Sequence, residues 1–151
     1  MKKKVIISII IFLILTIGIF TSLTLHRMYR EEQEKQELKA RARYSEIKES
    51  VKKAVEWNIN AQYPNCSITK ENKDATPRGY YNSSFLIKNG YIKKDELLDV
   101  DNKSYCSVYV EIYVYFENPL DHQNNCEAYH KIYLKCKDYK DKGYKNRGLD
   151  Y

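Results

Sequence analysis

Residues 5–25 form an apolar stretch without a charged side chain, VIISIIIFLILTIGIFTSLTL. A helix that crosses the ~30 Å hydrocarbon core of a bilayer needs about 20 such residues. Three lysines, at positions 2–4, precede the stretch, and a basic flank favours the cytoplasmic side. The pattern predicts a single-pass membrane helix over residues 5–25, with residues 1–4 in the cytoplasm and the rest of the chain outside it. A cleaved signal peptide is the alternative, but its apolar core is shorter, about 7–15 residues.

Residues 26–43 are mostly charged or Gln and contain neither Gly nor Pro. Such residues are good helix formers. Two pairs with favourable i,i+4 spacing, Glu31 with Lys35 and Glu37 with Arg41, support a helix. Because apolar residues are too sparse here to form a buried face, we expect a solvated helical stalk.

A different pattern begins at Tyr44, where apolar residues recur at steps of three and four until Pro64 ends the helix. They are Tyr44, Ile47, Val51, Ala54, Val55 and Ile59. One apolar stripe on a helix needs a partner surface. The stripe is short for a coiled coil, so packing against a sheet of the same chain is the preferred interpretation.

Strict alternation of apolar and polar residues marks 105–116 and 126–137 as two antiparallel strands joined by a long loop. If Phe116 faces Cys126, Val108 meets Leu134 and Cys106 meets Cys136, and every apolar side chain keeps to one face. A slip by one residue would turn the apolar side of the second strand into water. A short helix capped within residues 82–84 runs through Lys88 and ends at Asn89-Gly90. A helical turn over 95–98 follows it and precedes a turn at 99–104. The resulting expectation is an α+β domain over 44–137, with a long helix on a small antiparallel sheet, and a polar tail over 138–151.

All four cysteines (Cys66, Cys106, Cys126, Cys136) follow the apolar stretch, which fits disulfides in an unreduced compartment. Four cysteines allow three pairings, and sequence alone does not decide among them. The strand register favours Cys106–Cys136, which leaves Cys66–Cys126. Two competing interpretations are metal sites. One is zinc at His122, Cys126 and His130, which lack paired Cys-x2-Cys spacing. The other is calcium at Asp99, Asp101 and Asn102, which lack the Gly and later Glu of an EF-hand. We expect no metal and no other cofactor.

The net charge of +6 could suggest nucleic acid, but without the three N-terminal lysines the excess of basic over acidic residues falls to three (23 against 20). Nucleic-acid binding is therefore not expected. The chain contains no phosphate-binding loop, dinucleotide fingerprint, G-x-S-x-G or H-E-x-x-H motif, and we expect no enzyme activity. The polar face of the strand pair carries Tyr109, Tyr113 and Tyr133 among lysines. This Tyr-rich face is either an ordinary solvated surface or a face that binds a polymer or small ligand.

The layout resembles the type IV pilin-like proteins, including the pseudopilins, of low-GC Gram-positive bacteria. The local likeness covers Leu86 to Val110, where Gly90-Tyr91, Asp99 and Ser104-Tyr105 hold the places of a Gly-Tyr pair, an aspartate loop and the entry to the sheet. The segment LKCKDYKDKGY, starting at Leu134, also looks similar. The resemblance implies a pilin-like fold and a role in assembly. Pilins have Gly before the apolar run and Glu at its fifth position, and this chain has neither.

The sequence therefore predicts a membrane-anchored extracytoplasmic structural or interaction protein for envelope assembly or secretion, which either associates with itself or binds secretion components. The alternative is an extracytoplasmic module that binds a wall polymer or small ligand through the Tyr-rich face.

Overall fold

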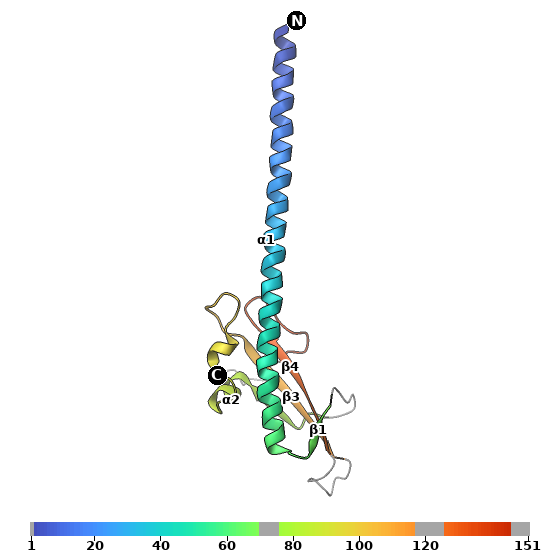
Figure 1. Cartoon of the computed structure of the whole chain (residues 1–151), viewed down its shortest axis with the longest axis vertical. Helices are drawn as coiled ribbons and strands as arrows, with labels where there is room; N and C mark the ends of the chain where they lie inside the picture. The colour runs from blue at the N-terminus through green and yellow to red at the C-terminus, as the bar shows by residue number, and fades with distance from the viewer. Residues whose placement is uncertain (1, 70–75, 117–125, 146–151) are drawn as a thin grey trace. The chain divides into compact units, whose positions relative to one another are not determined.

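The structure is a computed structural model of the chain and describes residues 2–69, 76–116 and 126–145, with side chains from residue 12 onward. The fold is α+β: one long N-terminal helix and a four-stranded mixed sheet (Figure 1). Two compact units divide the chain, residues 1–41 and 42–151, and the boundary falls within helix α1 (Lys2–Gln62).

In the first unit, α1 exposes its large apolar side chains: Phe12, Leu15, Phe20 and Leu25 are all 59–72% exposed. The hydroxyls of Thr16, Thr21 and Thr24 donate to backbone carbonyls three or four residues earlier, so these polar groups are satisfied inside an apolar stretch. Among the described residues, α1 is the one helix long and apolar enough to span a membrane.

The stalk residues in the first unit are helical and exposed, as predicted. Arg41 forms an ion pair with Glu37 at 3.8 Å, whereas Glu31 and Lys35 form no ion pair within the described part of the chain. Since an exposed ion pair contributes at most about 1 kcal/mol to stability, the missing Glu31–Lys35 pair has little effect on the stability of the helix.

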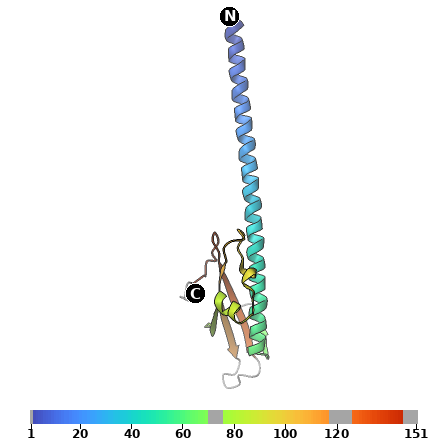
Figure 2. The same ribbon diagram turned by 90° about the vertical axis from the view of Figure 1, so that its left-hand side faces the viewer.

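In the second unit, the predicted stripe of α1 forms part of the core: Ile47, Val51, Val55 and Ile59 are at most 1% exposed. Figure 2 shows this part of the helix lying along one face of the sheet. Strands β3 (Ser107–Phe116) and β4 (Cys126–Lys135) supply the opposing apolar residues, including Val108, Val110 and Leu134. The hydrophobic effect therefore joins the helix to the sheet, at roughly 1.5–3 kcal/mol for each fully buried side chain.

The register of the two long strands is confirmed. Val108 pairs with Leu134, and Phe116 with Cys126, in antiparallel orientation. Residues 117–125, which contain the predicted long loop, lie outside the described residues.

The sheet is mixed, and the expectation of an antiparallel sheet is wrong at one edge. The order is β1-β4-β3-β2, and β1 (Cys66–Ile68) runs parallel to β4, while β2 (Gly79–Asn82) is antiparallel to β3. Both edge strands are too short to show a period of two, so the alternation that revealed the central pair could not reveal them.

The two predicted short helical elements are confirmed. Helix α2 (Ser83–Lys88) is capped by Asn82, whose side-chain oxygen accepts from the backbone N–H of Phe85 at 2.7 Å. Gly90 follows it with φ of 71°, a conformation that favours glycine. A 3-10 turn, η1 (Lys94–Leu97), comes next.

The C-terminal segment was expected to be a polar tail, but residues 138–145 pack on the rest of the second unit. Tyr139 stacks on Tyr44 with ring centroids 4.5 Å apart, and Asp141 accepts from Lys48 at 2.8 Å. Tyr144 is 7% exposed. Partial burial disfavours the charged ammonium of Lys48, but its hydrogen bonds to Asp141 and Tyr139 outweigh burial and raise the pKa of Lys48.

The C-terminal segment comes closest to the sheet at Gly143, because a Cβ atom at this position would overlap the ring of Tyr133. We expect Gly143→Ala to lower the free energy of unfolding by about 1–3 kcal/mol, the range for overpacking a filled site. Gly79→Ala is the matched control, since a Cβ at Gly79 meets nothing within 4 Å. Urea unfolding of the full chain in detergent measures both, and equal stabilities would contradict the packing described.

Candidate functional site

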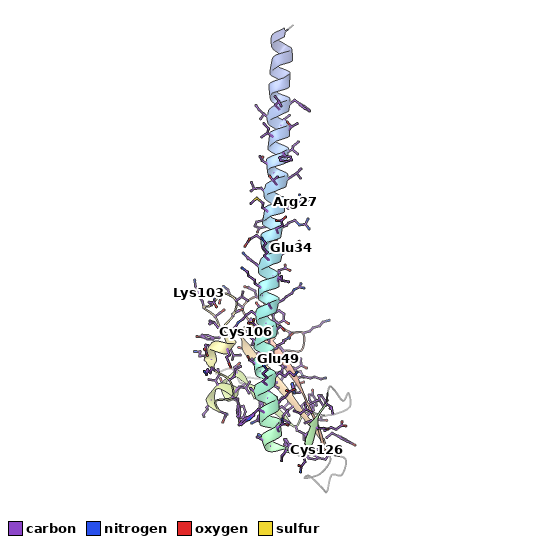
Figure 3. All side chains as sticks on the ribbon, in the orientation of Figure 1. Arg27, Glu34, Glu49, Lys103, Cys106 and Cys126 are labelled. Carbon is purple, nitrogen blue, oxygen red and sulfur yellow. A yellow bond between two sulfur atoms is a disulfide. The ribbon has the colours of Figure 1, made fainter. Side chains whose placement is uncertain are left out.

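Two disulfides close the two ends of the β3–β4 pair: Cys106–Cys136 at one end and Cys66–Cys126 at the other, with Cα atoms 4.2 and 4.4 Å apart. Figure 3 labels Cys106 and Cys126 near opposite ends of the sheet. These are the pairs that the register argument favoured. Each contributes typically about 2–4 kcal/mol, more for the longer loop, and such cross-links matter in a domain with a thin core. Cys66–Cys126 also holds β1 beside β4.

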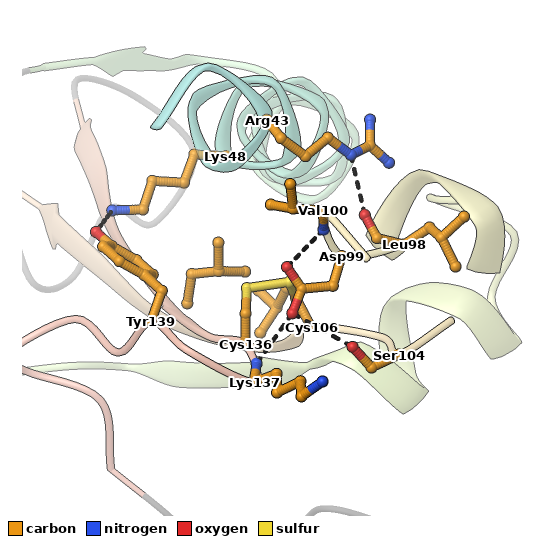
Figure 4. Close-up of a disulfide and its surroundings, with 12 residues drawn as sticks. Arg43, Lys48, Leu98, Asp99, Val100, Ser104, Cys106, Cys136, Lys137 and Tyr139 are labelled. Carbon is orange, nitrogen blue, oxygen red and sulfur yellow. Dashed lines mark hydrogen bonds between the residues drawn. A yellow bond between two sulfur atoms is a disulfide. The ribbon is translucent and has the colours of Figure 1, made fainter. Parts of the chain in front are cut away.

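Asp99, which the sequence offered as a calcium ligand, instead organises the chain around the Cys106–Cys136 disulfide (Figure 4). It is 3% exposed, and its carboxylate accepts from the backbone N–H of Val100 at 2.6 Å and of Lys137 at 3.0 Å. Asp99 thus links the 99–104 turn to the segment after β4.

Asp101 has a similar structural role in the same turn. The backbone N–H groups of Ser104 and Lys103 donate to it at 2.8 and 2.9 Å and hold the pKa of Asp101 far below its ordinary value. Asn102, with φ of 53°, adopts the left-handed conformation that Asn tolerates in turns. The arrangement is that of a turn held by its own carboxylates.

One group of three possible metal ligands occurs among the described residues: Asp99, Cys106 and Cys136, with ligand atoms within 4.8 Å of one another. Both sulfur atoms belong to a disulfide, and zinc is bound by thiolates. The zinc set suggested by the sequence does not assemble either, because Cys126 is bonded to Cys66. His122 lies outside the described residues.

His130 lies on the helix-facing side of β4, opposite Ile112. Its Nδ1 atom is buried and makes no hydrogen bond within the described part of the chain. Burial lowers the pKa of His130, so the ring is neutral at pH 7.

The Tyr-rich face is largely covered. Tyr109 and Tyr113 are only 3% and 7% exposed, and Tyr133 is half-buried. Tyr144 packs edge-on against Tyr109, and Lys145 reaches Glu111 at 3.3 Å, so the C-terminal segment accounts for much of the burial. A solvent-exposed face was expected at these tyrosines, either as an ordinary surface or for binding a ligand, and the middle of this face is instead a second small core.

At the centre of this second core lies a buried carboxylate, Glu111, which is 3% exposed. The hydroxyls of Tyr113, Tyr109 and Tyr133 donate to it at 2.7, 3.3 and 3.3 Å. Burial alone raises the pKa of a carboxyl group, but the hydrogen bonds from Tyr113 and Lys145 outweigh burial and lower the pKa of Glu111. A buried carboxylate with this many donors is a structural group, and its partners are the three tyrosines proposed for binding.

The second unit also has an open groove that the sequence did not reveal. It has a volume of about 550 Å³ and lies between α1 and the turn that follows α2. Its lining includes Trp57, Tyr91, Lys53, Glu96, Ser50 and Asn89. Trp57 is 64% exposed, and its ring centroid lies 5.7 Å from that of Tyr91. The one feature of the sequence that could have indicated this groove is Trp57, a single Trp on the helix outside the apolar stripe.

Comparison with protein-family models, with curated proteins and with solved structures finds no significant match.

The role of Glu111 predicts how stability depends on pH. Because the folded-state pKa of Glu111 is below its ordinary value, the unfolded chain takes up this proton first as pH falls. The contribution of Glu111 is therefore complete above about pH 5 and is lost as pH falls through the folded-state pKa. We expect Glu111→Gln to lower the free energy of unfolding by about 1–3 kcal/mol at pH 7.

The matched control is Glu127→Gln on the adjacent strand, where the side chain is exposed. Urea unfolding at pH 7 and at pH 3 measures both variants. The destabilisation by Glu111→Gln should shrink at pH 3, and a loss that is independent of pH would contradict an ionised Glu111.

Proposed function

We propose that the chain is a single-pass membrane protein that holds a disulfide-bonded α+β domain outside the cytoplasm and acts there as a structural or interaction protein. The observation that carries this proposal is the exposure of the apolar stretch. Phe12, Phe20 and Leu25 are 67–72% exposed, and the described residues of the first unit offer them no packing partner outside the helix; such a surface is stable in lipid.

The disulfides support the proposed side of the membrane. Both cross-links lie beyond the apolar stretch, and structural disulfides persist in oxidising compartments. Lysines at positions 2–4 before the stretch favour the same orientation, with the N-terminus in the cytoplasm.

The resemblance to pilin-like proteins extends the proposal to envelope assembly or secretion. A long helix whose C-terminal stripe packs on a small disulfide-bonded sheet supports it at the level of architecture. The other proposal, a binding module that uses Tyr109, Tyr113 and Tyr133, has less support because their hydroxyls are bonded to Glu111.

Reporter fusions at the C-terminus of the full chain test the orientation. Alkaline phosphatase, which becomes active only where its own disulfides form, should be active, and β-galactosidase at the same position should be inactive. The protein should remain in the membrane fraction at its full mass. The reverse activities would contradict the orientation, and a soluble product that lacks its first residues would contradict the anchor.

A further inference from the structure

We propose that the groove at Trp57 and Tyr91 binds a segment of a neutral glycan, with the sugar rings stacked on the two aromatic side chains. This inference gives the second unit a ligand site on a different surface from the Tyr-rich face.

The exposure of Trp57 is the first argument. Its neighbours Val55, Asn58 and Ile59 are at most 2% exposed, whereas Trp57 is 64% exposed. An exposed large aromatic residue is informative when it lies in a concave site, because binding surfaces are enriched in Trp and Tyr. The volume of about 550 Å³ falls in the range of small-molecule sites.

Tyr91 is held in place before any ligand binds. Tyr91 lies beside Phe85, whose ring stacks on Tyr81 at 4.5 Å. The hydroxyl of Tyr81 in turn donates to the buried Asn58, the residue after Trp57. The backbone N–H of Tyr91 donates to the carbonyl of Leu86 at 2.9 Å. Such preorganisation reduces the entropy lost on binding.

The polar lining indicates an uncharged ligand. Lys53 and Glu96 place one cation and one anion in the groove, so their charges offset each other. Lys53 makes no hydrogen bond or ion pair within the described part of the chain, and its ammonium is therefore available to a ligand. Ser50 and Asn89 add a hydroxyl and an amide. A sugar ring matches this mixture, because it presents an apolar C–H face for stacking and hydroxyls that both donate and accept.

A peptide that binds as an added strand fits the groove less well. A peptide strand gains affinity by adding to an open sheet edge. The groove is lined by α1 and by the turn after α2, whereas the edges of the sheet are β1 and β2. The glycan is thus the favoured occupant, and its encounter with a cell-surface polymer rests on the proposed extracytoplasmic position.

The experiment uses the fact that Trp57 is the sole tryptophan of the chain, so tryptophan emission reports directly on the groove. The full chain in detergent micelles is titrated with the tetrasaccharides of N-acetylglucosamine and of glucose and with polyproline, and is also diluted without ligand. We expect a saturable change in emission with at least one tetrasaccharide. No saturable change with either sugar overturns the proposal. An emission change with polyproline alone would assign the groove to a peptide, and a change that depends only on protein concentration would assign it to a second copy of the chain. Either result overturns the proposal.

Variants separate binding in the groove from general effects. Tyr91→Ala should weaken sugar binding by about tenfold, equivalent to about 1.4 kcal/mol. Tyr115→Ala, which removes a tyrosine that is 50% exposed outside the groove, should leave binding unchanged. Trp57→Ala removes the fluorescent probe, so its sugar binding is measured by calorimetry. This variant should lose binding while its unfolding midpoint stays the same. Retained binding in both groove variants would overturn the assignment.

Pull-down of the full chain on insoluble cell-wall glycan, with free tetrasaccharide as competitor, distinguishes a polymer ligand from a free oligosaccharide. If the protein is retained on the cell-wall glycan and free tetrasaccharide releases it, the ligand is the polymer. If the protein is not retained but still binds the tetrasaccharide in solution, the ligand is the free sugar. Both results support the groove. These measurements use purified protein and do not depend on membrane orientation, so failure here leaves the reporter-fusion result standing, and the converse also holds.

Discussion

The register between β3 and β4 is the constraint on which the rest of the second unit depends. With Val108 opposite Leu134, the apolar residues of both strands face the stripe of α1. The same register brings Cys106 opposite Cys136, and the parallel pairing of β1 with β4 brings Cys66 beside Cys126. A shift by one residue would expose the core and separate Cys106 from Cys136, so hydrophobic burial and this disulfide select the same alignment.

The other face of the sheet shows how a small domain obtains a second core. Its central residues are polar, yet Glu111 and the surrounding tyrosine hydroxyls satisfy one another, and the C-terminal segment covers them. A buried carboxylate is tolerated when several donors compensate for its lost hydration. The segment is held from both sides of the sheet, since Asp141 binds Lys48 of α1 while Lys145 binds Glu111.

The elements with a long or regular pattern could be predicted from the sequence. The apolar stripe from Tyr44 to Ile59, the alternation of β3 and β4, and the Asn82 cap all depend on local spacing. The edge strands and the burial of Tyr109 and Tyr113 could not be predicted in this way, because they depend on contacts between residues far apart in the chain. The groove is a similar case: Trp57 and Tyr91 are 34 positions apart and meet only in the folded domain.

A disulfide map of the protein isolated from its own membrane, obtained by peptide mapping without reduction and with free thiols blocked at lysis, tests the account most directly. It examines the strand register and the compartment together. We expect two linked peptide pairs, Cys106 with Cys136 and Cys66 with Cys126. A linkage between Cys106 and Cys126 would contradict the register, and four blocked thiols would contradict a disulfide-bonded domain outside the cytoplasm.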